Sequence, residues 1–242
     1  MAVRADINKC FSESGVNMND FAQKIQQQAL LLGFEGCGIC ALETPEDVDF
    51  VKHWLARGWH GKMDWMVHHL ELRADLTRIM PQAKRAILVR MAYPVDTRSS
   101  ELLLNAPTHG YISRYALGRD YHKVLRGRLQ KLGIWMSEQL QPLGFRVCVD
   151  SAPVLEKALA REAGLGWIGK HTLLLHREAG SYFFLGVLLT DAELPIEKTI
   201  GAYMTVRGER SAAKTNHAPV SGAAAGVLPY APTKGSATPC HI

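Results

Sequence analysis

Apolar strand-like segments alternate with amphipathic helical segments along most of this 242-residue chain, and this alternation most limits how it folds. Apolar residues recur at helical spacing in residues 19–32 and 121–135, whereas residues 85–94 and 181–190 are short, almost continuous apolar runs. Helices and strands that alternate in this way pack as helices against a sheet. We therefore predict an α/β fold, a mixed sheet flanked by helices, in which strands 171–176 and 181–190 form a hairpin.

The residue composition divides the chain into three parts. Residues 1–17 are polar and are predicted to be a flexible N-terminus, and residues 18–195 carry all the alternating segments. From Ile196 onward Ala, Gly, Pro, Ser and Thr dominate and apolar periodicity is lost, so residues 196–242 are predicted to be a disordered tail. There is no run of about 18 apolar residues and no secretory signal pattern. We expect a cytoplasmic monomer with no membrane partner.

The formal net charge of +5 is weak support for nucleic-acid binding. The excess of Lys and Arg lies mainly in the tail, and the preceding residues are nearly neutral. Net charge informs solubility and association rather than a specific site. The charge alone therefore does not identify a partner.

The five cysteines include a single C-x-x-C pair, Cys37 and Cys40, in GFEGCGIC. The segment reads as a strand, in which these two side chains point to opposite faces. The histidines His60, His68, His69 and His122 likewise lack a metal-ligand spacing shared with carboxylates. We predict core cysteines and no metal site formed by these residues.

Residues 164–169 read GLGWIG, which has the G-x-G-x-x-G spacing of dinucleotide-binding loops. Such loops need a strand before the glycines and a helix after them, because the helix N-terminus binds the pyrophosphate. Here the order is reversed, with the helical segment VLEKALAREA before Gly164 and a strand-like segment after Gly169. We predict a helix C-cap at Gly164 followed by a connection to a strand.

Asp150 ends the apolar segment FRVCVD just before a predicted helix, Pro153 to Glu162. Site residues of α/β proteins often lie beyond the carboxyl ends of strands, and a carboxyl group there can act as a general acid. The spacing equally suits helix capping by Asp150 or Ser151. Both interpretations remain open from the spacing alone.

Several segments together resemble the epoxyqueuosine reductases, in the same order and across roughly residues 18–195. They are HGKMDWMVHH, ISRYALGRDYHKVLRGRL, VDSAPVLEKALAREAGLGWIGKHTLLL and GSYFFLGVLLTD. The resemblance implies a cobalamin-dependent enzyme that reduces epoxyqueuosine at the tRNA wobble position, the last step of queuosine synthesis. It further implies two [4Fe-4S] clusters, a tRNA anticodon stem-loop as partner and an external electron donor.

The resemblance also assigns residues. It implies that Asp150 is the proton donor and that Arg73, Ser113, Leu174 and Leu185 line the cobalamin. By the same resemblance, the expected contacts to tRNA phosphates are Arg114, Lys157, Arg161 and Lys170.

The sequence departs from the family after residue 195, where the cysteine-rich cluster motifs are expected. Each [4Fe-4S] cluster needs four thiolates, and only Cys240 follows that point. We therefore expect this chain to be an inactive truncation, and we hypothesise that a frameshift replaced its C-terminal region. The alternatives are a non-catalytic cobalamin-binding or RNA-binding module and, on the basis of GLGWIG, a nicotinamide or flavin oxidoreductase.

Overall fold

The computed structural model describes residues 16–93, 104–105, 107–108 and 110–196. The predictions for the N-terminus before residue 16 and for the tail after Ile196 lie outside these residues. The elements, in chain order, are α1 (Met18–Leu31), β1 (Gly36–Cys40), α2 (Pro45–Ala56), α3 (Asp64–His68), α4 (Leu70–Ala74), η2 (Leu76–Arg78), β2 (Arg85–Ala92), η3 (Arg114–Ala116), α6 (Tyr121–Gln139), β3 (Phe145–Cys148), α7 (Glu156–Glu162), β4 (Trp167–Ile168), β5 (Leu174–Leu175) and β6 (Phe183–Thr190).

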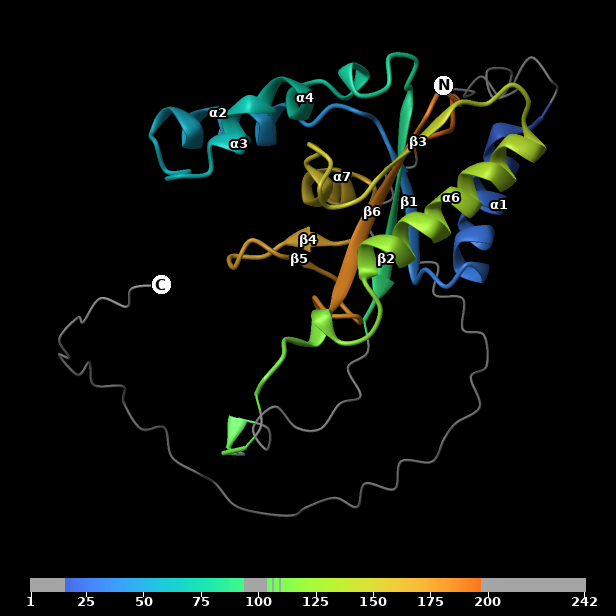
Figure 1. Cartoon of the computed structure of the whole chain (residues 1–242). Helices are drawn as coiled ribbons and strands as arrows, with labels where there is room; N and C mark the ends of the chain where they lie inside the picture. Colours follow the sequence, from blue (N-terminus) through green and yellow to red (C-terminus); the bar gives the residue numbers. More distant parts are fainter. Residues whose placement is uncertain (1–15, 94–103, 106, 109, 197–242) are drawn as a thin grey trace, which may run out of the picture. The chain divides into compact units, whose positions relative to one another are not determined.

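Four strands form the main sheet in the order β1-β2-β6-β3 (Figure 1). The two central strands pair along their whole length, from Arg85 opposite Thr190 to Ala92 opposite Phe183. Most residues of β2 and the second half of β6 are buried, as expected for strands covered on both faces. The predicted α/β fold with a helix-flanked sheet is confirmed.

The strand directions differ from the expected mixed sheet, since all three ladders in the described sheet are antiparallel. Strands β2 and β3 do run in the same direction and are connected through α6, as in a βαβ unit. However, β6 is inserted between them and runs antiparallel to both. A strand–helix–strand pattern in the sequence predicts that β2 and β3 run in the same direction. It does not reveal that β6, which comes later in the chain, lies between them.

Helices cover both faces of the sheet and create two hydrophobic clusters. On one face, α1 and α6 pack over a cluster that includes Ile25, Ile87 and Leu129 (Figure 1). On the other, α7 and the β4–β5 pair cover a cluster that includes Leu88 and Leu159. Adjacent residues of β2 thus enter opposite clusters, as the period of two requires.

The predicted hairpin between residues 171–176 and 181–190 is wrong. Strand β5 pairs instead with β4, with Trp167 opposite Leu175 and Ile168 opposite Leu174. Between β5 and β6, one isolated antiparallel bridge joins His176 to Gly180. Strand β6 is paired with β2 along its whole length and with β3 from Val187 to Thr190, whereas β5 pairs locally with the strand just before it, β4.

The predicted order of helix and strand around GLGWIG is confirmed. Helix α7 ends before the motif, and the Gly164 N–H donates to the Arg161 carbonyl at 3.0 Å. Gly164 has φ of 75°, the left-handed conformation of a C-terminal cap. The glycines therefore follow the negative end of a helix dipole, and this geometry contradicts a dinucleotide-binding loop at this place.

The C-x-x-C pair is also placed as predicted. Cys37 packs against the α1–α6 cluster, whereas Cys40 belongs to the cluster beneath α7. Burial raises the pKa of both thiols to about 12. Both are therefore core residues rather than reactive thiols or ligands.

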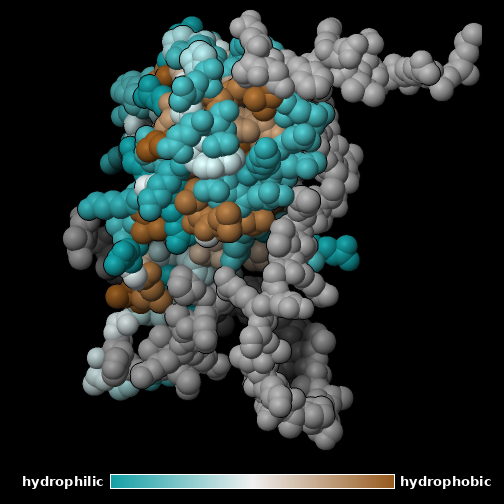
Figure 2. All heavy atoms as spheres, turned by 90° about the vertical axis from the view of Figure 1, so that its right-hand side faces the viewer, coloured by the Kyte–Doolittle hydropathy of each residue, from teal (hydrophilic) through white to brown (hydrophobic). Residues whose placement is uncertain are grey.

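The outer face of α1 and α6 is mainly hydrophilic, with scattered apolar patches (Figure 2). Leu31 on α1 and Ile134 on α6 are among the exposed apolar residues. In the part of the chain that the structure describes, no helix is both long and apolar enough to cross a membrane.

Candidate functional site

Asp150 lies just beyond the end of β3, where the chain leaves the sheet. Strand β3 ends at Cys148, Val149 is fully buried, and Asp150 is the first exposed residue. Its φ of 48° lies in the left-handed region, which Asp tolerates better than most residues. The backbone therefore turns at this residue and presents its carboxyl group, 56% exposed, beyond the sheet.

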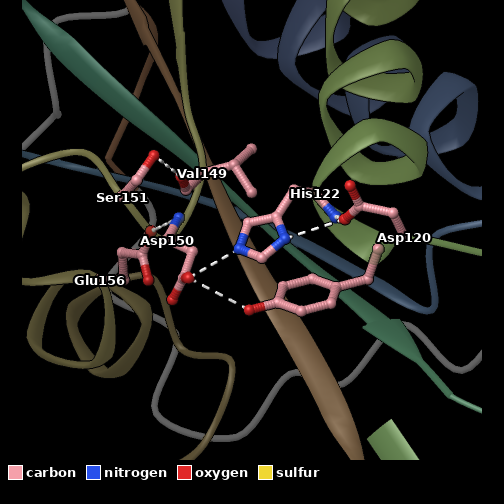
Figure 3. A network of polar contacts seen from close by, with 7 residues as sticks. Asp120, His122, Val149, Asp150, Ser151 and Glu156 are labelled. Carbon is pink, nitrogen blue, oxygen red and sulfur yellow. Dashed lines mark hydrogen bonds and ion pairs between the residues drawn. The ribbon is translucent and has the colours of Figure 1, made fainter. Parts of the chain in front are cut away.

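Two side chains from the start of α6 contact the Asp150 carboxyl group (Figure 3). The His122 Nε2 atom lies 2.8 Å from Oδ2, and the Tyr121 hydroxyl donates to the same oxygen at 3.1 Å. Among the hydrogen bonds of the described residues, those of the Asp150 carboxyl group both end on Oδ2. None of the hydrogen bonds found among the described residues ends on its Oδ1 atom.

Asp120 orients the imidazole of His122 from the other side. Its Oδ1 atom accepts from the His122 backbone N–H at 3.0 Å and lies 2.9 Å from Nδ1. A carboxylate only accepts hydrogen bonds, so this contact places a proton on Nδ1 and directs Nε2 towards Asp150. The chain Asp120–His122–Asp150 is visible in Figure 3.

The charges of this network shift the pKa values of its members. Hydrogen bonds to Asp150 and then to Asp120 raise the pKa of His122. The hydrogen bond from His122 lowers the pKa of Asp120. Burial, and then the charge of Asp150, raises the pKa of Tyr121 to about 12, so its hydroxyl remains a donor.

Glu156, the first residue of α7, holds the backbone of Asp150. Its Oε1 atom accepts the Asp150 N–H at 2.8 Å. Burial, the largest cause, raises the pKa of Glu156 to about 7. Helix α7 has Leu155 at its N-cap without a side-chain cap, and the Ser151 hydroxyl donates to the Val149 carbonyl at 3.4 Å. Neither Asp150 nor Ser151 caps α7, so the capping interpretation is wrong.

A connected set of aromatic rings adjoins Asp150 and is called here the aromatic cluster: Tyr93, Tyr115, Tyr121, Tyr182 and Phe184. Tyr121 stacks on Phe184 at 4.0 Å between ring centroids and on His122 at 3.9 Å. The rings of Tyr115 and Tyr182 are about half exposed, at 52% and 45%. This end of the sheet therefore presents a partly exposed apolar surface beside a carboxyl group.

Three other residues predicted from the resemblance lie on η3, just before it, or on β6. Ser113 is exposed and precedes η3, and Arg114 lies over the Tyr182 ring at 5.6 Å. Leu185 of β6 is partly buried, two residues before Val187, which pairs with Cys148 near Asp150. The roles of these three residues at a cofactor or at RNA stay predictions.

Two other predicted cofactor contacts are more deeply placed. Leu174 is 3% exposed and lies in the cluster beneath α7, to which Leu185 also packs. Arg73 on α4 is 9% exposed, donates to the Met66 carbonyl at 3.3 Å and lies over the Trp65 ring at 5.6 Å. Arg73 therefore contacts the preceding helix α3, and its role at a cofactor stays a prediction.

The remaining basic candidates differ in their environments. The Lys157 ammonium donates to the Thr172 carbonyl at 2.7 Å, and Lys170 is exposed. Arg161 pairs with Asp47 at 2.8 Å and with Glu162 at 2.9 Å. Their contact with RNA stays a prediction, and Arg161 is the one already engaged by two carboxylates.

The sequence reasoning missed four members of the network: Asp120, Tyr121, His122 and Glu156. The signal that could have found the first three is RDYH, in which an acidic N-cap and two ring side chains open a long helix. Glu156 carried no comparable signal. Within the described residues, no three His, Cys, Asp or Glu side chains are grouped to hold a metal ion.

Comparisons with known proteins support the resemblance. Residues 73–151, which include most of the network, match the family model described as "Epoxyqueuosine reductase QueG, DUF1730". The epoxyqueuosine reductase of Escherichia coli is 50% identical over 186 residues, covering 76% of this chain and 49% of that protein. The protein of the same name from Pseudomonas aeruginosa is 50% identical over 177 residues, covering 73% and 49%.

Solved structures share the fold. Epoxyqueuosine reductase from Streptococcus thermophilus has a TM-score of 0.61 at 24% identity, covering 74% of this chain and 48% of its own. An epoxyqueuosine reductase crystallised with an epoxyqueuosine-modified stem loop of tRNA-Tyr has a TM-score of 0.62 at 23% identity, with coverage of 77% and 50%. The chain spans about half the length of the relatives it matches.

Proposed function

We propose that this chain is a member of the epoxyqueuosine reductase family over its aligned region and that it carries the acid–base centre for reducing epoxyqueuosine to queuosine in tRNA. The observation that carries the proposal is the Asp120–His122–Asp150 network at the end of the central sheet. The reaction removes the epoxide oxygen and leaves an alkene, which consumes two electrons and two protons and releases water. A proton donor next to the departing oxygen is therefore required.

Asp150 is the proposed donor. Its Oδ1 atom faces away from the contacts made by Oδ2, so a proton carried there can pass to the departing oxygen of the substrate. The carboxylate that results is stabilised on Oδ2 by His122 and by the hydroxyl of Tyr121. Placing such a donor typically accelerates a reaction by about 10² to 10⁴.

The surface around Asp150 fits a broad, mainly apolar cofactor with a polar rim, as a corrinoid is. The partly exposed rings of Tyr115 and Tyr182 and the side chain of Leu185 would contact its face, and the hydroxyl of Ser113 would bond to its rim. Leu174, being buried, would support Leu185 rather than make a large contact. Bound cobalamin would supply the electrons for the reduction.

Two related structures support the placement of the substrate and of the loop. The enzyme crystallised with a modified tRNA stem loop shows that a protein of this fold is known with that partner. A Bacillus subtilis enzyme of the same fold, with a TM-score of 0.59 at 21% identity, is described with its aspartate catalytic loop swung out of the active site. The loop that carries Asp150 in this chain is proposed to be its counterpart, and the substrate a tRNA anticodon stem-loop.

Electrons for turnover are proposed to come from outside this chain. Two [4Fe-4S] clusters require eight thiolates, and the sequence contains five cysteines, of which Cys37, Cys40 and Cys148 are core residues. On its own the chain is therefore expected to be inactive unless a strong chemical reductant replaces the clusters.

The test is an assay of the purified chain with tRNA carrying epoxyqueuosine, cobalamin and a strong reductant, with nucleoside products separated by chromatography. Cobalamin binding is followed by visible absorption in the same samples. Conversion to queuosine by the wild type, and none by Asp150→Ala with cobalamin still bound, supports the proposal. Equal conversion by both proteins contradicts the role of Asp150, and cobalamin binding without any conversion indicates a non-catalytic cobalamin-binding module.

A further inference from the structure

His122 contacts the proposed acid and is itself exposed to solvent, and two contacts fix the orientation of its ring. Its Nδ1 atom is held by the carboxylate of Asp120 at 2.9 Å, and its Nε2 atom lies 2.8 Å from Oδ2 of Asp150. Its side chain is 41% exposed. The imidazole therefore touches the acid on one edge and remains accessible to water.

The short contact between Nε2 and Oδ2 requires one proton between the two atoms. With a proton committed to Nδ1 by Asp120, a neutral imidazole has only a lone pair at Nε2, and an ionised carboxylate has no proton to offer. With one proton the pair is either neutral imidazole with a carboxylic acid or imidazolium with a carboxylate, and a second proton on Oδ1 gives the carboxylic acid beside imidazolium, the form that can donate. Such a pair holds its proton jointly and titrates as a unit.

The two oxygens of Asp150 separate the entry of a proton from its exit. Oδ2 receives the contacts of His122 and Tyr121, whereas Oδ1 carries none of the side-chain hydrogen bonds recorded in the described region. A proton can thus leave from Oδ1 while another arrives at Oδ2. Rotation of the carboxyl group about its Cβ–Cγ bond then brings the new proton to the substrate side, and the strained backbone does not need to move.

We propose that His122, oriented by Asp120, restores the proton that Asp150 gives to the substrate, so that the three residues form a proton relay from solvent. The O–H bond of Asp150 breaks as the O–H bond of the departing oxygen forms. The N–H bond at Nε2 of His122 then breaks as the new O–H bond at Oδ2 forms. His122 takes its next proton from water, and no electrons are exchanged among these residues.

The relay deepens the proposed function and rests on it, since it supplies the acid of that same reaction. The charged and titratable groups that face His122 are Asp120 on its own helix end, Asp150 beyond β3 and Glu156 on α7, with Tyr121 beside it. Asp120 and Asp150 make direct contacts, whereas Glu156 contacts only the backbone of Asp150. The behaviour of His122 should therefore depend mainly on the two aspartates.

The first experiment needs no turnover. The pKa of His122 is measured by NMR titration of ¹⁵N-labelled imidazoles in the wild-type chain, in Asp150→Asn and in Asp120→Asn. We expect both substitutions to lower the pKa of His122 and leave that of His176 unchanged, because His176 has a lowered pKa set mainly by burial. An unchanged His122 pKa in Asp150→Asn overturns the relay, whether or not the chain is active.

The second experiment separates proton transfer from packing. In the cobalamin and reductant assay, His122→Ala should lose turnover, and added imidazoles should restore it with rates that follow their basicity, as general acid–base catalysts do. Rescue that is independent of basicity, or full activity of His122→Ala, contradicts the relay. If the wild type shows no turnover, the proposed function fails, and the NMR titration still decides whether the pair shares a proton.

Discussion

At the scale of single residues, the backbone of Asp150 limits which side chains can occupy the site. Its φ of 48° costs most side chains about 1–2 kcal/mol, whereas Asp and Asn adopt this conformation readily. A strained residue that carries an exposed acid is a combination common at functional sites. A substitution at Asp150 that does not tolerate positive φ therefore changes the backbone energy as well as removing the acid, whereas Asn removes the acid alone.

Asp150→Asn is expected to remove the acid and keep the turn. The amide preserves size and tolerance of positive φ, so the free energy of unfolding should change by less than about 1 kcal/mol, whereas queuosine formation should fall by about 10² or more. Asp150→Ala should lose activity and also unfold at lower denaturant concentration. Chemical denaturation alongside the product assay distinguishes them, and an active Asn variant would exclude Asp150 as the acid.

Glu156→Gln is expected to stabilise the fold in a pH-dependent way. The folded chain holds the Glu156 proton up to a pKa of about 7, so wild-type stability decreases as pH rises from the ordinary carboxyl range to about 7. The neutral amide avoids this loss and still accepts the Asp150 N–H. The variant should match the wild type near pH 4 and exceed it by up to about 3 kcal/mol at pH 8. Denaturation at both pH values checks this, and an equal difference at the two would contradict burial as the cause.

Asp150 could be predicted from the sequence, but its partners could not. A polar residue at the end of an apolar strand is a local pattern, and it identified Asp150 as a candidate. The contact of His122 with Asp150 joins residues 28 positions apart, and it depends on where α6 begins relative to the sheet. Spacing along the chain contains no such information.

At the scale of elements, one glycine controls how closely a helix approaches the sheet. A Cβ at Gly38 of β1 would overlap the Ala163 carbonyl oxygen at the end of α7, far inside van der Waals contact. A Cβ at Gly36, on the same face of the same strand, would meet Leu165 no closer than 3.4 Å. Alanine at Gly36 is therefore a control for alanine at Gly38, because only the second would collide with α7.

Gly38→Ala should lower the free energy of unfolding by about 1–3 kcal/mol, because α7 must move away from β1. Gly36→Ala should change it by less than about 1 kcal/mol. Because α7 carries Glu156, Gly38→Ala should also weaken the anchor of Asp150. Thermal denaturation of both variants is the measurement, and equal effects would show that helix approach is not the limiting contact.

Helices were easier to predict than strand pairing. The predicted helix of residues 19–32 agrees within one residue with α1, since its apolar face is a local pattern. Strand pairing is not a local pattern of this kind. Strand β6 pairs with β2 and β3, which are remote from it in sequence, and β5 pairs with β4.

At the scale of the whole molecule, the four basic residues proposed to face RNA should contribute unequally. Lys170 is exposed, whereas Arg161 is already paired with Asp47 and Glu162. Each phosphate contact contributes about 0.7–0.9 to the slope of log affinity against log salt concentration. Lys170→Ala is therefore expected to reduce this slope by about one contact, and Arg161→Ala by less.

Fluorescence anisotropy with a labelled tRNA anticodon stem-loop, repeated across salt concentrations, measures the slope for each variant. Arg161→Ala serves as the control for loss of an arginine that is held by carboxylates. If Arg161→Ala reduces the slope as much as Lys170→Ala does, Arg161 leaves Asp47 and Glu162 when the chain binds RNA.

The central position of β6 has a consequence for how the protein is made. Residues 183–190 are the last of the sheet to leave the ribosome, yet β2 and β3 have no contact with each other in the sheet except through them. Until they emerge, β3 has no partner strand and β2 can pair only with β1, so apolar strand edges stay exposed, which is the condition in which chaperones bind. We therefore expect the four-stranded sheet to be completed late, after β6 has emerged, and α1 and α6 to pack on it only then.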